Sequence, residues 1–252
     1  MPYLRWSSLV LTCFYSATLL SEGTDSRLAG PSVRAGIVHN QTVPFAIISP
    51  SGHLVGGLQK LTLDEVAARL RGQGQFVVLP RERLATALNA GDIDMACFID
   101  MNDLPDANLV DWSHALLYSQ QIIVRRHVKS QNEPVVLHRI GTEFGVQYPV
   151  FEQAFRQRQI LRSDSAALTS NLQRLIHKRV DGVLTTDLAY AALQRSLPTM
   201  PKFAIDVLPE AKIALQCAVS QSSPHRMQLL QALSRMSGEG FFAAATAKYQ
   251  TL

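Results

Sequence analysis

The stretch that decides the fold is LATALNAGDIDMACFIDMNDLPDANLVDWS, residues 84–113. Apolar side chains at helical spacing from Leu84 to Leu88 predict a helix, and Gly91 stands where a helix end favours a residue that tolerates positive φ. The apolar run Ile93–Phe98 follows at once and predicts a strand buried on both faces. Open α/β sheets bind ligands at the carboxyl ends of such strands, so we expect any small-molecule site to include residues from Ile99 to Asp106.

Strand-like and helix-like segments alternate along the rest of the chain. The predicted strands are Val33–Val38, Gln75–Leu79, Gln120–Val124, Val180–Leu184 and Ile213–Val219. The predicted helix starts are a Thr62–Glu65 capping box, Tyr148-Pro149, a cap at Asp164 or Ser165, Ser223-Pro224 (a helix through Met236) and Phe241 (a helix to Tyr249). This alternation predicts an α/β fold with largely parallel sheets. The helix–strand units Leu84–Phe98 and Leu172–Leu184 follow the same plan, which suggests two similar lobes.

Composition is that of a folded chain without an extended basic surface. Of the 252 residues, 47% are hydrophobic and 17% charged, which is ample for a packed core and unlike a disordered protein. The net charge of +4 comes from scattered residues, and no run of Lys and Arg exceeds two. We therefore expect solvated charged faces and no nucleic-acid partner.

The N-terminus differs from the rest. Residues 1–23 carry a positive residue, Arg5, then an apolar run from Ser7 to Leu20 and small residues near a possible cleavage point. The run is short for a membrane span, which needs about 20 apolar residues. We interpret residues 1–23 as a signal peptide and expect a periplasmic protein, with a short N-terminal anchor as the alternative.

Two cysteines follow this segment, Cys97 and Cys217, and both lie in apolar strand-like runs. An even pair in an oxidising compartment permits one disulfide. Free cysteine is also commonly buried, and two buried free thiols are the interpretation we favour from the sequence.

Several segments, in one collinear order from about Val33 onward, resemble the type II periplasmic solute-binding proteins of family 3, the polar amino-acid-binding kind. They are VPF 43–45, LPRERL 79–84, GDID 91–94, VDWS 110–113, IGT 140–142, YP 148–149, RVD 179–181 and AVSQSSP 218–224. The resemblance implies a two-lobed Venus-flytrap fold with mixed, mostly parallel sheets and crossing strands near residues 114–119 and 210–216. Lobe 1 would comprise residues 24–115 plus 214–252, and lobe 2 residues 116–213.

The function that the resemblance implies is capture of a small polar solute and delivery to an ABC-type permease in the inner membrane. Such proteins are monomers that close two lobes on the ligand, without a cofactor and without catalysis. The exported chain is therefore expected to be a receptor rather than an enzyme.

The family's ligand residues carry over less well. An arginine usually holds the ligand's α-carboxylate, but this chain has Asp106 there, and Arg81 replaces the aromatic clamp. An aspartate would repel a carboxylate that an arginine fork would hold, so a free α-amino acid in the usual pose is not expected. Arg81 and Asp106 could pair with each other, or hold opposite ends of a zwitterion in reversed orientation.

The first-loop aromatic of the family falls at Thr42, with Phe45 nearby, and the acidic residue that meets the α-amino group falls at Thr186, with Asp187 beside it. Polar groups at predicted strand and helix ends complete the candidate set. The predicted ligand-binding residues are His39, Thr42, Phe45, Arg81, Asp100, Asp106, Gln147, Tyr148, Thr186 and Asp187.

Catalytic and metal-binding motifs are absent from the sequence. There is no Gly-x-Ser-x-Gly or His-Glu-x-x-His, and the seven histidines form no close ligand set, so neither catalytic residues nor a metal site is predicted. Two alternatives to a solute receptor stay open. One is an enzyme that uses His39 with Asp100 or Asp187 as acid and base. The other is an accessory protein whose degenerate pocket has given way to binding a protein partner.

Overall fold

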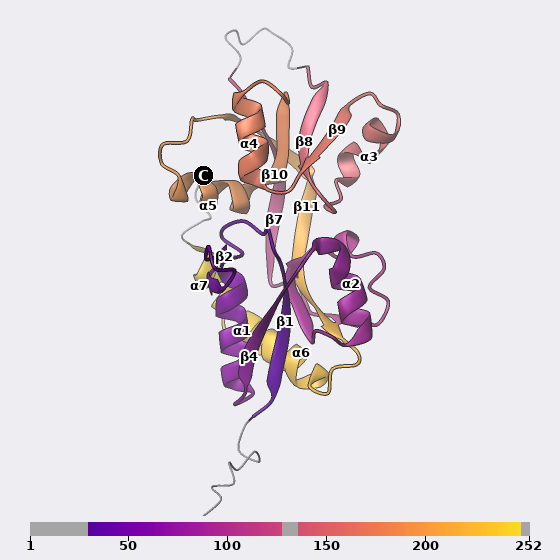
Figure 1. The fold of residues 1–252 in the computed structure, drawn as a ribbon, viewed down its shortest axis with the longest axis vertical. Helices are drawn as coiled ribbons and strands as arrows, with labels where there is room; N and C mark the ends of the chain where they lie inside the picture. The colour runs from indigo at the N-terminus through magenta and orange to yellow at the C-terminus, as the bar shows by residue number, and fades with distance from the viewer. Residues whose placement is uncertain (1–29, 128–135, 248–252) are drawn as a thin grey trace, which may run out of the picture.

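The protein is described by a computed structural model that covers residues 30–127 and 136–247. Figure 1 shows two halves, one above the other, joined by two long strands, β7 (Leu117–Arg125) and β11 (Ala204–Ser220). The predicted signal segment, residues 1–23, and Tyr249 at the end of the last predicted helix lie outside the described residues. In the part of the chain that is described, no helix is both long and apolar enough to cross a membrane.

The lower half of Figure 1 contains the stretch that opened the sequence analysis. Its strands are β1 (Ser32–Val38), β4 (Gln73–Leu79), β5 (Met95–Ile99) and β6 (Val110–Trp112), with a small hairpin of β2 (Ile47–Ile48) and β3 (Leu54–Gly56). Its helices are α1 (Leu58–Arg69), α2 (Arg81–Ala90), α6 (Arg226–Gly238) and α7 (Phe241–Thr246), and a single 3-10 turn, η1 (Met101–Asp103), follows β5. Gly91 ends α2 at φ 75°, which confirms the predicted glycine stop.

The upper half repeats the alternation. Its strands are β8 (Arg139–Glu143), β9 (Leu161–Ser165) and β10 (Gly182–Thr186), and its helices are α3 (Pro149–Arg156), α4 (Leu168–Ile176) and α5 (Asp187–Ser196). Tyr148-Pro149 does begin a helix, with the proline at its first position.

Nine of the described strands form one continuous sheet in the order β4-β1-β5-β11-β7-β10-β8-β9, with β6 paired to β11. Within each half the outer strands are parallel: β1 with β4 and β5, and β8 with β9 and β10. The two long strands run antiparallel to each other and to their neighbours. The predicted α/β fold with mixed sheets is confirmed, and the carboxyl ends of the parallel strands in both halves lie toward the middle of the molecule.

Two predicted helix starts are wrong. Helix α1 begins at Leu58, four residues before Thr62, because Gly57 at φ 94° turns the chain and the amides of Leu58 and Gln59 donate to the carbonyls of Pro44 and Phe45, each at 2.9 Å. The N–H groups that a capping box would satisfy therefore already have backbone partners. Thr62 is buried inside the helix instead.

Helix α4 also begins without the cap predicted for it. Its N-cap is Ala167, whereas Asp164 and Ser165 belong to β9. Asp164 accepts a hydrogen bond from Thr142 Oγ1 at 2.9 Å and pairs with Arg162, so its carboxylate is used within the sheet. Strand β11 is much longer than Ile213–Val219 because its first residues, from Ala204, pair with β7 in the upper half.

Cys97 and Cys217 are joined by a disulfide, so the interpretation as free thiols is wrong. Both are buried, as predicted. They stand opposite each other in the β5–β11 register with Cα atoms 3.9 Å apart, a pairing that residues 120 positions apart in the sequence do not reveal. The bond attaches the strand before the Ile99–Asp106 loop to the long strand that joins the halves.

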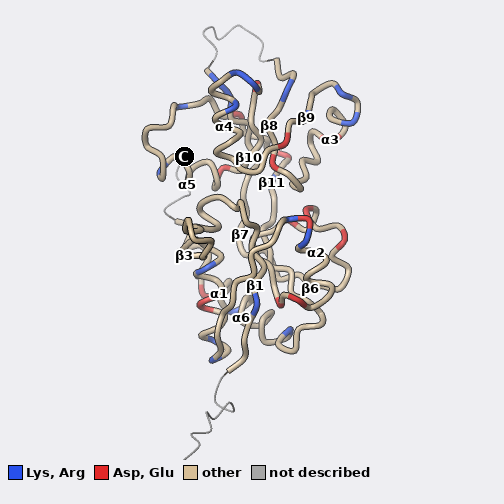
Figure 2. The backbone as a smooth tube through the Cα atoms, in the orientation of Figure 1, with Lys and Arg blue, Asp and Glu red and all other residues tan. Residues whose placement is uncertain are grey.

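Apolar packing continues from one half to the other. The largest buried cluster extends from Val33 and Leu63 in the lower half, past Phe98 and Leu215, to Leu172 in the upper half. Smaller clusters lie around α2 and around the β8 end of the upper half. Charged residues of both signs are distributed over both halves (Figure 2).

Candidate functional site

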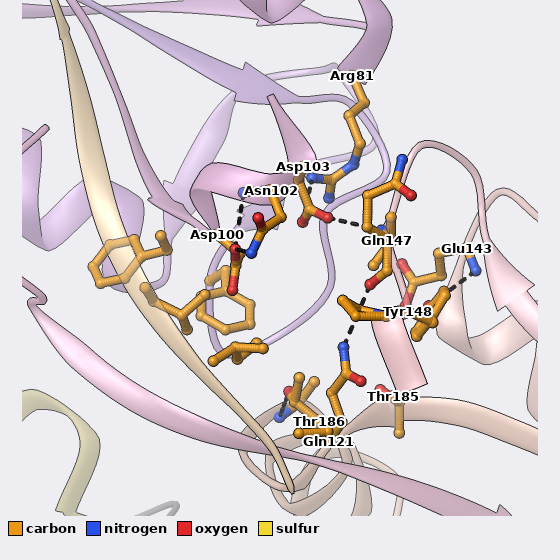
Figure 3. A pocket seen from close by; sticks show the side chains of 18 of the residues that line it. Arg81, Asp100, Asn102, Asp103, Gln121, Glu143, Gln147, Tyr148, Thr185 and Thr186 are labelled. Carbon is orange, nitrogen blue, oxygen red and sulfur yellow. Dashed lines mark hydrogen bonds and ion pairs between the residues drawn. The ribbon is translucent and has the colours of Figure 1, made fainter. Parts of the chain in front are cut away.

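A cavity of about 190 Å³ lies where the two halves face each other, at the carboxyl ends of strands from both (Figure 3). The lower half lines it with Asn40, Gln41, Thr42, Phe45, Arg81, Phe98, Asp100, Asn102 and Asp103. The upper half lines it with Glu143, Phe144, Val146, Gln147, Tyr148, Pro149, Val150, Thr185, Thr186 and Ala189. The long strands add Gln121, Glu210, Ala211, Lys212, Ile213 and Leu215. Both halves therefore form its walls.

Seven of the ten predicted ligand-binding residues line this cavity: Thr42, Phe45, Arg81, Asp100, Gln147, Tyr148 and Thr186. They come from separate segments that each follow a strand or open a helix. Thr186, for example, ends β10 and caps α5, with its Oγ1 accepting from Ala189 N at 3.2 Å. Strand ends, a helix start and the family resemblance led to their selection, and their role in binding stays a prediction.

The other three, His39, Asp106 and Asp187, are not among the cavity-lining residues. His39 is an exposed residue after β1 whose amide bonds the carbonyl of Leu79 at 3.1 Å. Asp106 is exposed in the loop beside α2, where its carbonyl accepts from Asn89 at 2.8 Å. The structure does not bring these side chains to the candidate site.

Asp187 is held by its own neighbours. Its Oδ1 accepts hydrogen bonds from Ser119 Oγ at 2.5 Å, from Gln120 N at 3.0 Å and from Leu188 N at 2.6 Å. These bonds attach the first turn of α5 to β7. Because the carboxylate accepts hydrogen bonds from these nearby donors, it points toward β7 and not into the cavity.

Arg81 pairs with Asp103 and not with Asp106. Its Nη1 lies 3.6 Å from Asp103 Oδ2, and the side chains are 17% and 12% exposed. The other oxygen of Asp103 accepts the backbone N–H of Gln147, in the opposite half, at 2.8 Å. Arg81 also packs on that half, since a Cβ on Gly145 would meet Arg81 Cδ at 2.7 Å. Asp103 and Arg81 therefore connect the two halves beside the cavity (Figure 3).

Glu143 is the other acidic residue of this wall. It ends β8, and no described residue donates a hydrogen bond to its carboxylate, although the Arg81 guanidinium is near enough to attract it. Burial raises the pKa of Glu143 to about 7, against the attraction of Arg81 and with repulsion from Asp103. Burial likewise raises the pKa of Asp103 to about 6, partly offset by Arg81 and by the Gln147 hydrogen bond.

The remaining walls are apolar or neutral. Phe45 and Phe98 lie with ring centroids 5.8 Å apart, and Tyr148, 2% exposed, accepts the amide of Glu143 at its hydroxyl at 3.3 Å. Gln121 of β7 donates from Nε2 to the carbonyl of Gln147 at 3.4 Å. Its Oε1 is buried without a hydrogen-bond partner among the described residues.

Sequence reasoning missed Asp103, Glu143 and Gln121. Asp103 lies within the Ile99–Asp106 loop that was expected to contribute, and Glu143 is the last residue of β8 in the structure. The strand-end rule therefore applies to both. Gln121 lies inside a strand, where no sequence signal separates a cavity-facing amide from any other polar strand residue.

The structure does not bring together the residues of the proposed acid–base pair. His39 and Asp187 do not line the cavity with Asp100, and Asp100 accepts from Asn102 N at 2.9 Å as the cap of η1. Among the described residues, no three or more His, Cys, Asp or Glu side chains gather as a metal site would require.

Of the comparisons with known proteins, the one with solved structures supports the fold. No protein-family model matches the sequence, and no curated protein matches it at the level required of a relative. Among solved structures, the arginine-specific periplasmic binding protein of Salmonella typhimurium is 17% identical, with a TM-score of 0.67 over 87% of this chain and 99% of that chain. The substrate-binding protein of an amino-acid ABC transporter is 15% identical, with a TM-score of 0.66 over 87% and 99%.

The GluR0 ligand-binding core, solved in complex with L-glutamate, is 13% identical, with a TM-score of 0.69 over 88% of this chain and 99% of that chain. Two of these neighbours, one specific for arginine and one solved with L-glutamate, have ligands of opposite side-chain charge. The likeness therefore shows the fold and does not identify a ligand. The chain has the two-lobed fold of the amino-acid-type periplasmic solute-binding proteins, as the sequence resemblance predicts.

Proposed function

We propose that this protein is a receptor for a small polar solute, which it encloses between its two halves. The observation that carries the proposal is the two-sided cavity, because a ligand there would touch residues such as Phe98 below and Tyr148 above at the same time. Contacts made only when the halves approach give the closed form a higher affinity, and that difference drives closure.

Contacts between the halves support this account. Besides Gln147 N to Asp103, the Asn40 side chain donates to the carbonyl of Ala166 across the gap. Asn40, Asp103 and Gln147 all line the cavity. Both contacts are of the kind that a hinged receptor makes when shut and breaks when open.

The lobe boundaries belong to the same proposal: residues 24–115 plus 214–252 for one lobe and 116–213 for the other. The chain enters the upper half through β7 and returns through β11, whose register shifts between Val207 and Lys212 before it pairs with β5. We place the hinge in these two strands. Export through residues 1–23, action as a monomer in the periplasm and delivery to an ABC-type permease complete the proposed function.

A thermal-shift screen of amino acids, amines and small organic acids tests the proposal. A ligand at about 100 times its Kd stabilises a protein by about 2.7 kcal/mol, enough to raise Tm measurably. We expect at least one compound class to do so. Gln147→Trp should abolish the shift by filling the cavity mouth with an exposed residue, whereas Gln153→Trp, an exposed residue of α3 away from the cavity, should retain it.

If no compound of the panel stabilises the protein, the receptor proposal fails. The accessory-protein alternative, with a pocket that no longer binds solutes, would then be the better account. If a compound stabilises Gln147→Trp as much as it stabilises the wild type, it binds elsewhere and the candidate site is wrong.

A further inference from the structure

The acidic residues of the cavity outnumber its basic ones. Four carboxylates line it (Asp100, Asp103, Glu143 and Glu210) against two cations, Arg81 and Lys212. Glu210 and Lys212 are exposed at the rim, and the Lys212 ammonium lies 4.4 Å from the centroid of the Tyr118 ring. Among the residues that line the interior, one guanidinium therefore faces three carboxylates. Arg162, which does not line the cavity, also attracts Asp103 and donates to the backbone carbonyl of Glu143.

The Arg81 guanidinium is already engaged. Arg81 pairs with Asp103 and lies against Gly145, with only a sixth of its side chain exposed, 17%. A ligand carboxylate that approached it would also meet Asp103 and Glu143, so repulsion would oppose the attraction. Asp106, at the position where the resemblance implies a carboxylate-binding arginine, is exposed and outside the cavity. In the interior, the described walls thus hold no cation without a carboxylate partner, and the exposed Lys212 lies over the Tyr118 ring.

Glu143 shows the opposite condition, because its half-buried carboxylate accepts no hydrogen bond from the described residues. Burial without hydrogen bonds disfavours its charged form, and the pKa of Glu143 rises to about 7 for that reason. A cation placed beside it would supply the missing partner and draw the proton off. The same cation would also attract Asp103, whose ion pair with Arg81, at 3.6 Å, is longer than a charge-assisted hydrogen bond.

The cavity has a second side chain, Gln121, with an acceptor that lacks a described partner. Gln121 is 4% exposed, its side chain reaches into the cavity from β7 (Figure 3), and its Oε1 has no partner among the described residues. The aromatic residues Phe45, Phe98 and Tyr148 line the cavity together with these acceptors. Unpaired acceptors together with aromatic rings suit a ligand that carries N–H donors and positive charge.

We propose, building on the receptor function, that the cavity selects a small organic cation without a carboxylate, such as a primary amine or a guanidine. Its charged end lies between Glu143 and Asp103, and its carbon chain lies against Phe45 and Phe98. Glu143 is the residue that determines this specificity.

Calorimetric titration with agmatine and arginine tests the proposal, because the two differ only in the carboxylate. At pH 8 agmatine should bind at least tenfold more tightly than arginine, and glutamate more weakly than either. Glu143→Gln should weaken agmatine binding at least tenfold, while Asp106→Asn, an exposed carboxylate outside the cavity, should leave it within twofold. Thermal melting of each variant checks that it is folded.

Proton release on binding is a second readout, and it would not change if Glu143 had only a structural role. Agmatine binding to the wild type at pH 7 should release protons, seen as a dependence of the measured heat on buffer ionisation, and Glu143→Gln should reduce that release. Arginine or glutamate binding as tightly as agmatine, or an unchanged affinity in Glu143→Gln, would overturn the cation proposal and leave the receptor function standing. Failure of every compound in the wider screen would overturn both.

Discussion

Two neighbouring strands of the upper half, β8 and β10, each deliver an acidic residue to the same end of the sheet, and the two residues have opposite surroundings. Asp187, directly after β10, accepts three hydrogen bonds from described donors. Glu143, at the end of β8, accepts none from the described residues and lines the cavity. Chain position brings a carboxylate to a strand end, but the nearby donors decide whether it is hydrogen-bonded within the fold or left available in the cavity.

The largest effect that separates the two is expected from Asp187→Ala. Removal of this carboxylate leaves the Gln120 amide and the Ser119 hydroxyl without their acceptor, and hydrogen bonds to charged groups contribute about 1.5–3 kcal/mol each. The free energy of unfolding should fall by about 2–3 kcal/mol in urea titrations. Asp106 is exposed, and its carboxylate accepts no hydrogen bond from the described residues, so Asp106→Ala should change the free energy of unfolding by less than about 0.5 kcal/mol. Equal effects of the two substitutions would remove the structural role given to Asp187.

Glu143→Gln should act in the opposite direction. The native pKa of Glu143, about 7, lies above its usual value of about 4.5, so the native state holds a proton that the unfolded state has lost in this window. Stability from this group is therefore present below about pH 4.5 and lost as the pH rises through about 7. Glu143→Gln should be more stable than the wild type at pH 8 by about 1–2 kcal/mol.

Denaturant titrations at pH 5 and pH 8 measure this prediction. The wild type should lose stability between the two values, and Glu143→Gln should lose less of it. Some slope should persist in the variant, because the pKa of Asp103 is also raised, to about 6. A variant that is less stable than the wild type at pH 8 would show that Glu143 has a partner in the native state.

The smallest effect is expected from substitution of Arg81, the cation near Asp103 and Glu143. Arg81 lowers the pKa of both Asp103 and Glu143, against the larger influence of burial. Arg81→Met should therefore shift the titration midpoint of Glu143 upward, by up to about one pH unit, in an NMR titration of the glutamate carboxyl carbons. Arg83→Met, an exposed residue of the same helix, is the matched control and should leave it unchanged. A downward shift in Arg81→Met would contradict the arrangement.

Much of the fold follows from local sequence patterns. The run of helix, Gly91 and buried strand predicts α2 and β5 well, since apolar spacing and a left-handed glycine stop are local properties. The starts of α1 and α4 were wrong for a common reason. Neither helix has a side-chain cap: the first amides of α1 donate to the carbonyls of Pro44 and Phe45, and α4 begins after Ala167. A sequence shows a possible cap without showing whether the chain uses it.

The candidate site, too, has a part that local sequence patterns predict and a part that they do not. Strand-end positions predict that Arg81, Asp100 and Thr186 come together, because topology alone brings those segments to one edge. The availability of each side chain is a three-dimensional property. Asp187 is engaged by Ser119 from 68 positions away, and Cys97 meets Cys217 across 120 positions, at separations that no local pattern records.

Closure of two halves around an organic cation is the central claim, and small-angle X-ray scattering measures it most directly. The radius of gyration of the wild type at pH 8 should fall when agmatine is added to saturation, whereas that of Gln147→Trp, with its cavity mouth filled, should not respond. A radius of gyration that stays constant in the wild type at saturating agmatine would contradict the account.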